Sequence, residues 1–305
     1  MRTLIVKNKK DIYLVEYLKK VFPSLKTSVI FKALRNKDIK LNDKRINTNI
    51  MLAPNDKLDI YINDTLLFNI PKEIKVIYED ENILVVFKPQ GILSNIELEN
   101  KKENSNSYLE PTLEDLVKNT YHCAKICHRL DRNTSGLVMF SKNDISYLEL
   151  LNGFKNGYIL KEYKAYVSNS NFVSKHEILE KYIKIDKLSG YSKIYDNFVK
   201  GSYKISTEYF VEYVDKKLDY AILRVIIHTG KTHQIRAQLK SISHPIIGDP
   251  KYGKNEINKK FKIYKQLLFA THYSFSFPTD SPLFYLNTIN ISLDNKYYNK
   301  NLGSD

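Results

Sequence analysis

The sequence predicts an α+β fold divided into two domains, and three observations support this prediction. A length of 305 residues exceeds the usual size of one domain and suggests two. Residues 11–22 repeat apolar side chains at helical spacing, which indicates an amphipathic helix near the N-terminus. Two pairs of apolar runs, 74–78 with 83–88 and 207–214 with 220–229, are separated by short polar segments and predict antiparallel hairpins.

Two helices and a small sheet account for the first predicted domain. The helix over 11–22 has Asp11 as its candidate N-cap and ends before Pro23, and a second helix is expected over 27–36. The strands of the sheet are predicted at 39–42 and 57–62. The chain is therefore divided into a first domain, a linker and a second domain at residues 1–62, 63–73 and 74–305.

Basic side chains concentrate in this first domain. They lie just before the second predicted helix, on its outer face and in the segment after it, as Lys26, Lys32, Arg35, Lys37, Lys40, Lys44 and Arg45. Such a cluster is enough to bind phosphates electrostatically, although a merely solvated basic face has the same composition. The whole chain carries 48 Lys and Arg against 34 Asp and Glu, a net charge of +14. This balance favours a nucleic-acid partner, but a lysine-rich proteome would give it too.

Composition also bears on the compartment. No apolar run approaches the ~18 residues of a membrane-spanning helix, and the N-terminus lacks the pattern of a secretory signal peptide. We therefore expect a cytoplasmic protein without membrane contact. Two cysteines provide no disulfide framework. Their order with two histidines, His122, Cys123, Cys127 and His128, raises the alternative of a zinc site, although the spacing fits none of the usual zinc motifs.

The second domain is expected to be rich in strands. After the first hairpin, the sequence predicts a flexible surface loop at 95–111, a helix at 112–121 with Thr112 as its cap, and strands at 137–141 and 163–167. Asp144 is the expected N-cap of a further helix, with Ile145, Leu148 and Leu151 facing inward. Residues 168–203 are too mixed for an assignment.

Two short stretches carry chemically useful side chains. In residues 127–142, Asp131 follows a basic pair on an expected loop, beside an apolar run typical of a buried strand. Taken alone, one acid in a polar loop is most often a turn residue or a surface charge. In residues 228–239, Thr232 is the candidate N-cap of a helix that places His233 and Arg236 on one face. Such a helix start suits an anion such as phosphate; a surface helix with incidental charges is the alternative.

The strings around these residues resemble motifs of the RluA-type RNA pseudouridine synthase family. HRLDRNTSGL at 128–137 resembles the catalytic motif, HTGKTHQIRAQL at 228–239 and HPIIGDPKYG at 244–253 resemble two further motifs, and LLFATHYSFSFP at 267–278 resembles the closing strand. Residues 11–62 resemble the alpha-L RNA-binding domain that often precedes this catalytic domain. The resemblance implies an α+β catalytic domain with a mixed, largely antiparallel sheet and flanking helices. It also implies an isomerase that converts uridine in RNA to pseudouridine.

The same resemblance suggests roles for individual residues. Asp131 matches the catalytic aspartate, which acts on the ribose as nucleophile or base. Tyr163 matches a tyrosine that stacks on the target base, although a plain strand aromatic would look the same, and Arg236 matches an arginine that pairs with the aspartate. RNA contacts are expected from His128, Arg129, Arg132, Lys231 and His233, and from Lys26, Lys32, Arg35, Lys44 and Arg45 in the first domain. For His128 a hydrogen-bonded structural role is an equal alternative. Neither a cofactor nor a metal is expected.

Three residues depart from the family pattern. Gln90 stands where alanine is usual, Lys231 where arginine is usual, and Gln238 where histidine is usual. Lysine keeps the positive charge but loses the bidentate phosphate geometry of arginine. The departures leave the three residues expected at the catalytic centre unchanged.

The expected partner is RNA, bound by a monomeric chain. Large-subunit ribosomal RNA is the favoured substrate, because the first domain is common among family members that modify it; transfer RNA is an alternative. A non-catalytic RNA-binding or ribosome-assembly protein and a hydrolase of glycosidic bonds are the competing functions. Typical glycosidases use two carboxylates, and Asp249, the one other acid in the motif strings, is interpreted as a turn residue between Gly248 and Pro250.

Overall fold

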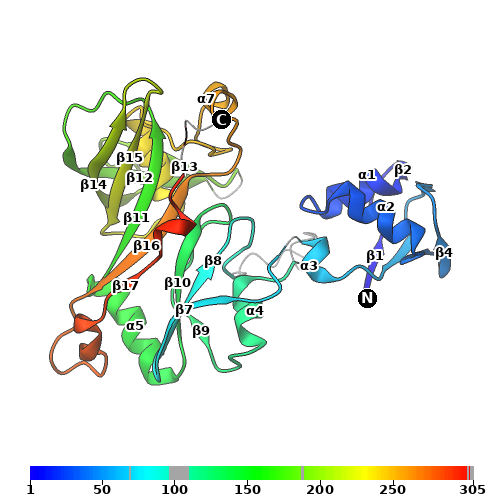
Figure 1. Cartoon of the computed structure of the whole chain (residues 1–305), viewed down its shortest axis with the longest axis horizontal. Helices are drawn as coiled ribbons and strands as arrows, with labels where there is room; N and C mark the ends of the chain where they lie inside the picture. The colour runs from blue at the N-terminus through cyan, green and yellow to red at the C-terminus, as the bar shows by residue number, and fades with distance from the viewer. Residues whose placement is uncertain (69, 96–109, 187–188, 301, 303–305) are drawn as a thin grey trace. The chain divides into compact units, whose positions relative to one another are not determined.

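The computed structural model describes residues 1–68, 70–95, 110–186, 189–300 and 302. The chain divides into two compact units, one built on residues 1–73 and the other on residues 74–95 and 113 onward (Figure 1). Among the described residues, no helix combines the length and the apolar character needed to cross a membrane.

The first unit contains a four-stranded antiparallel sheet in the order β1-β6-β3-β4 and two amphipathic helices. The strands of the sheet are β1 (Arg2–Ile5), β3 (Ile39–Leu41), β4 (Lys44–Ile46) and β6 (Lys57–Ile60), and the helices are α1 (Leu14–Val21) and α2 (Thr27–Arg35). Both predicted helices are present, but the predicted Asp11 cap is wrong. The chain forms strand β2 (Ile12–Tyr13) paired with β5 (Met51–Leu52), so the cap position moves to Tyr13.

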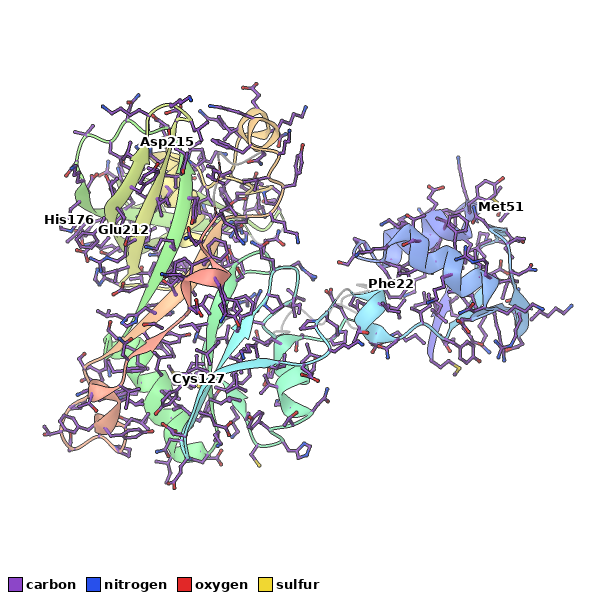
Figure 2. The ribbon with its side chains drawn as sticks, viewed as in Figure 1. Phe22, Met51, Cys127, His176, Glu212 and Asp215 are labelled. Carbon is purple, nitrogen blue, oxygen red and sulfur yellow. The ribbon has the colours of Figure 1, made fainter. Side chains whose placement is uncertain are left out.

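The segment predicted as a linker begins with a short helix, α3 (Asp64–Leu67), whose N-terminus is capped by the side chain of Asn63. Arg2 on β1 donates two hydrogen bonds of 2.7 Å to the Asp64 carboxylate. Phe22, labelled in Figure 2, lies at the end of α1. Phe68 packs edge-on against it, with ring centroids 5.3 Å apart. These contacts join the start of the segment to the first unit.

The second unit is organised on one large sheet. Within the described residues the sheet has eleven strands, with the main order β13-β12-β14-β15-β11-β16-β10-β8-β7 and with β17 on β16 and β9 on β10. The pairings of these strands are antiparallel except for β10 with β16, which is parallel. The expected mixed, largely antiparallel sheet is confirmed.

The bounds of its elements follow the chain. The strands are β7 (Lys75–Glu79), β8 (Ile83–Lys88), β9 (Lys125–Ile126), β10 (Ser135–Ser141), β11 (Ile159–Ser168), β12 (His176–Asp186), β13 (Tyr191–Tyr195), β14 (Tyr203–Asp215), β15 (Tyr220–Ile227), β16 (Leu268–Phe275) and β17 (Ile291–Ser292). The helices are α4 (Leu113–Lys118), α5 (Asp144–Asn156), α6 (Gln234–Ser241) and α7 (Asn255–Lys260), with 3-10 turns at Phe284–Thr288 and Asn295–Tyr297.

Both predicted hairpins are present, as β7 with β8 and β14 with β15. The unassigned region 168–203 contains β12 and β13, whose side chains are largely exposed, so the apolar alternation that marks a half-buried strand is weak there. Most of the predicted loop 95–111 lies outside the described residues.

Helix α5 buries a different face from the one predicted. Ile145, Leu148 and Leu151 were expected inside but are 71%, 68% and 38% exposed. The buried positions are Ser146, Leu150 and Gly153. A Cβ atom at Gly153 would lie 2.9 Å from the ring of Phe277, so small residues let the helix approach the fold closely. The predicted Asp144 cap is also wrong, because the side chain of Asn143 accepts the Ser146 amide instead.

Strand β10 is buried along its whole length, and the loop that precedes it therefore lies next to the middle of the sheet. Its parallel contact with β16 is close: a Cβ atom at Gly136 would lie 2.1 Å from the carbonyl oxygen of Ala270. Strand β11 runs beside β16 on the other side, as Figure 1 shows. The loop before β10 is thus held next to the side chains of β11.

Candidate active site

A cavity of about 260 Å³ opens where three segments of the second unit meet. They are the loop before β10, strand β11, and the turn that leads from β15 into α6. The residues lining it include Asp131 from the loop, Tyr163 and Lys161 from the strand, and Arg236 and His233 from the helix start. The three residues predicted for the catalytic centre therefore come together.

The loop that carries Asp131 is fixed at several points by hydrogen bonds. The hydroxyl of Ser94 donates a hydrogen bond of 2.9 Å to the carbonyl of Leu130 and accepts one of 3.0 Å from the backbone amide of the same residue. The fully buried Lys88 donates to the carbonyls of Pro89, Arg132 and Thr134 at 2.9–3.1 Å. Burial lowers the pKa of Lys88 to about 7, but three acceptors engage three hydrogens, which only the ammonium form has.

Arg236 links two acids. Its Nη1 donates to Oδ2 of Asp131 at 2.9 Å, while its Nε and Nη2 donate to the two oxygens of Asp249 at 2.7 and 2.9 Å. Burial alone would lower the pKa of Arg236, but the hydrogen bonds and charges of both acids outweigh it and raise that pKa. The guanidinium is therefore a fixed cation beside Asp131, as predicted.

Asp249 is a second acid of this network, which the sequence analysis missed. Its Oδ1 accepts hydrogen bonds of 2.8 and 2.9 Å from the backbone amides of Lys251 and Tyr252, so the predicted turn role is confirmed. The bidentate pair with Arg236 is an additional role. Burial raises the pKa of Asp249, but the bonds from Arg236 and the two amides reverse this and lower it. The signal available in the sequence was weak, because the burial that requires a partner for an acid is not visible in one string.

Tyr163 presents its side chain to the cavity from β11 and is 5% exposed. Burial, and to a smaller extent the charge of Asp131, raise the pKa of its hydroxyl. The hydroxyl stays protonated at neutral pH, and the ring forms a flat apolar wall beside the acid.

His128 is hydrogen-bonded within the fold, as expected for the structural alternative that the sequence left open. Its Nε2 accepts a hydrogen bond of 3.2 Å from the backbone amide of Met139 and lies within hydrogen-bond distance of the Tyr273 hydroxyl. The ring also packs edge-on against Phe154. Burial, assisted by the charge of Lys161, holds the pKa of His128 well below its usual range. The neutral imidazole anchors the loop to β10 and lines one side of the cavity.

The predicted Thr232 cap of α6 is wrong. The cap position is His233, which adopts a left-handed backbone with φ of 58° and makes no side-chain cap bond. This turn directs the ring toward Asp131, with Nε2 3.8 Å from Oδ2, while Nδ1 contacts the Tyr252 hydroxyl at 3.0 Å. Burial lowers the pKa of His233 to about 4 despite the opposing charge of Asp131, so the ring is neutral at physiological pH.

The other predicted RNA-binding residues lie on the surface or near the cavity mouth. Arg129 and Lys231 line the cavity, and Lys231 places its ammonium 4.4 Å from the centre of the Tyr203 ring. Arg132 donates to the carbonyl of Gly91 at 3.0 Å. In the first unit, the side chains on α2 and β4 and before α2 are exposed, namely Lys26, Lys32, Arg35, Lys44 and Arg45.

Two sequence departures have structural explanations. Gln238 is fully buried, accepts from the Thr207 hydroxyl and donates to the carbonyl of Leu179 at 3.0 Å, so it ties α6 to the sheet. Gln90 donates to the carbonyl of Gln266. Neither residue lines the cavity.

The two cysteines are unbonded to each other: Cys123 is exposed and Cys127 is buried. In the part of the chain that the structure describes, no group of three His, Cys, Asp or Glu side chains is arranged to hold a metal.

Comparisons with known proteins agree with this geometry. The sequence pattern of the family described as RNA pseudouridylate synthase matches residues 82–241. The chain is 31% identical over 301 residues to the "Uncharacterized RNA pseudouridine synthase" of Mycoplasma capricolum subsp. capricolum, covering 93% of this chain and 94% of that protein. It is 29% identical over 265 residues to the "Ribosomal large subunit pseudouridine synthase C" of Rickettsia felis, covering 79% and 82%. The fold is similar to the solved structure of "Human RNA Pseudouridylate Synthase Domain Containing 1", with a TM-score of 0.55 and 18% identity over 73% of this chain and 84% of that chain.

Proposed function

This chain belongs to the RNA pseudouridylate synthase family, whose members isomerise uridine in RNA to pseudouridine, and we propose that its substrate is the RNA of the large ribosomal subunit. Two observations support this substrate. Several similar proteins from Rickettsia species carry the name "Ribosomal large subunit pseudouridine synthase C" and align with about four fifths of the chain. The exposed basic side chains of the first unit also suit a large, folded polyanion.

The observation that carries the catalytic assignment is the bonding of Asp131. One of its oxygens is held by Arg236, whereas the other has no hydrogen bond from any described residue. The acid thus has a fixed orientation and a free oxygen at the edge of the cavity. We assign Asp131 the role of acting on the ribose of the target nucleotide, and Arg236 the role of holding it in place.

The cavity has room for one extruded nucleoside and not for a helix. A uridine stacked within RNA is inaccessible, so the enzyme must flip the nucleotide out, at a cost of a few kcal/mol for unstacking. The flat wall offered by Tyr163 is suited to stack on the uracil. Contacts between basic side chains and the RNA backbone would offset the cost of extrusion.

The first unit is proposed to be an alpha-L type RNA-binding domain, with Lys26, Lys32, Arg35, Lys44 and Arg45 contacting phosphates. We propose that the chain acts as a monomer. An enzyme for ribosomal RNA works where ribosomes are assembled, which agrees with the cytoplasmic location that the sequence predicts.

The test is to map pseudouridine across total RNA from cells with and without the gene, after complementation with wild type and with Asp131→Asn. The proposal expects sites in large-subunit ribosomal RNA that disappear with the gene and return only with wild type. A matched control is Asp144→Asn, because the Asp144 side chain is 82% exposed and pairs with the partly exposed Lys125. If the sites that disappear lie in transfer RNA instead, transfer RNA is the substrate. If Asp131→Asn fully restores the phenotype of cells that lack the gene, a non-catalytic assembly role is favoured.

A further inference from the structure

The cavity contains a lysine that the sequence analysis did not single out. Lys161 lies two residues before Tyr163 on β11, so the two side chains project from the same face of the strand, and both line the cavity. Its ammonium is 4.9 Å from the centre of the Phe154 ring, which packs against the hydrophobic core behind the cavity. A Cβ atom at Gly230 would lie 3.6 Å from the same nitrogen, so the turn before α6 packs directly beside the ammonium.

The charge of Lys161 is not balanced by a neighbour. Both acids of the site, Asp131 and Asp249, form ion pairs with Arg236, and Lys88 donates its hydrogen bonds to three backbone carbonyl groups. Among the described residues, Lys161 has neither an ion pair nor a hydrogen-bond acceptor. Burial lowers its pKa to about 8 with no acid to oppose the change, so it is still mostly protonated at pH 7. A cation that lines a cavity without a hydrogen-bond acceptor in the protein can donate hydrogen bonds to an acceptor on the ligand.

The chemistry of the reaction provides that acceptor. When the bond between N1 and C1′ breaks, its electron pair stays on the uracil and is shared with the carbonyl oxygens. Asp131 either forms a bond to C1′ or accepts a proton from the ribose in the same step. The negative charge disappears when C5 bonds to C1′, a step that releases Asp131 from C1′ or returns the proton that it took from the ribose. C5 then gives up its proton and N1 gains one, so the product uracil is neutral. Phosphates of the extruded nucleotide remain with the RNA backbone at the mouth, whereas the Lys161 ammonium lies against the core side.

We propose that Lys161 is a catalytic residue that donates a hydrogen bond to a carbonyl oxygen of the extruded uracil and stabilises the uracil anion during bond cleavage. This proposal rests on the proposed isomerase function. An ammonium placed where negative charge develops is worth about 10²–10³ in rate at sites of this type. Its contribution to binding is smaller, since the neutral uracil of the ground state accepts a weaker bond.

The experiment measures single-turnover release of tritium from C5 of uridine, with enzyme in excess over total RNA from cells that lack the gene and were labelled with [5-³H]uridine. Variants are Lys161→Met, which keeps the length without the charge, and Lys161→Arg, which keeps the charge. Lys164→Met is the matched control, because Lys164 lies on the same strand, outside the cavity, and pairs with Glu212. RNA affinity and melting temperature are measured for each variant.

We expect Lys161→Met to lose about 10²-fold in rate with RNA affinity within about 3-fold and an unchanged melting temperature. Lys161→Arg should retain part of the rate and should remove any loss of activity that wild type shows above about pH 8. The Lys164→Met rate should stay near wild type. A Lys161→Met rate within about 3-fold of wild type would overturn the catalytic role, as would an equal loss of rate and affinity with a lower melting temperature. Absence of tritium release by wild type would instead overturn the proposed function itself.

Discussion

The replacement Asp249→Asn tests whether the buried network of Asp249, Arg236 and Asp131 orients Asp131 for the catalytic role that we propose. The Asp249 side chain has no exposed surface, and its Oδ1 accepts from Arg236 and from two backbone amides. An asparagine would keep its oxygen at that position and place its NH₂ group opposite the Nε–H of Arg236. One charge-assisted bond of 2.7 Å is then replaced by two facing donors.

The expected cost in stability follows from these contacts. Removing one partner of a buried ion pair typically costs 3–5 kcal/mol, and the retained bond to Asp131 places this variant near the lower end, at about 3 kcal/mol. Urea unfolding of wild type and variant gives the difference in free energy directly. We also expect the single-turnover rate to fall about 10²-fold with RNA affinity little changed, since Arg236 loses the partner that fixes its orientation.

The matched control is Asp294→Asn, which removes an exposed acid whose pair with Lys296 leaves both side chains more than half exposed. Its effect on the free energy of unfolding should be much smaller than that of Asp249→Asn, because solvent screens the exposed pair. If Asp249→Asn were as mild as this control in both stability and rate, the proposed link from Asp249 through Arg236 to Asp131 would be refuted.

Three further predictions concern the fold around the site. Gly136→Ala should lower the free energy of unfolding by more than about 4 kcal/mol or prevent folding, because its Cβ would lie 2.1 Å from the β16 backbone. Gly157→Ala is the control, since Gly157 has a positive φ but open space around it, and it should lower the free energy of unfolding by only about 1–2 kcal/mol in the same urea denaturation assay. A maleimide should label the exposed Cys123 and spare Cys127, whose pKa burial raises to about 12, as peptide mass spectrometry can check; equal labelling would contradict the burial. Unfolding free energy should fall as the pH drops below 6.5, because His128 has a lower pKa folded than unfolded and the unfolded chain therefore binds more protons. His128→Gln should show a smaller fall.

The sequence predicted those parts of the fold whose signal is local. Hairpins with short polar connections and helices with one apolar face were placed within a few residues, since periodicity and turn chemistry are read from neighbouring positions. The orientation of α5 was wrong for a physical reason. Its apolar residues Ile145 and Leu148 face outward, while the close approach of Gly153 to Phe277 decides which side is buried. A preference of that kind depends on packing against distant segments.

The same distinction holds for the site. Asp131, Tyr163 and Arg236 were found through motif resemblance, and the structure brings them to one cavity. Asp249 and Lys161 were missed because their importance lies in what surrounds them: one acid is buried against a guanidinium, and one ammonium has no acid nearby. Neither condition can be read from residues close in sequence.

The bonds around Arg236 are compatible with the reactive role proposed for Asp131. Asp249 accepts from the Nε and Nη2 groups, and Asp131 accepts from the Nη1 group. If Asp131 itself were paired bidentately, both of its oxygens would be engaged and neither could approach the ribose. The second acid therefore does more than balance charge. It holds the Nε and Nη2 edge of the guanidinium, while Asp131 receives the Nη1 bond through Oδ2 and its other oxygen accepts no hydrogen bond from the described residues.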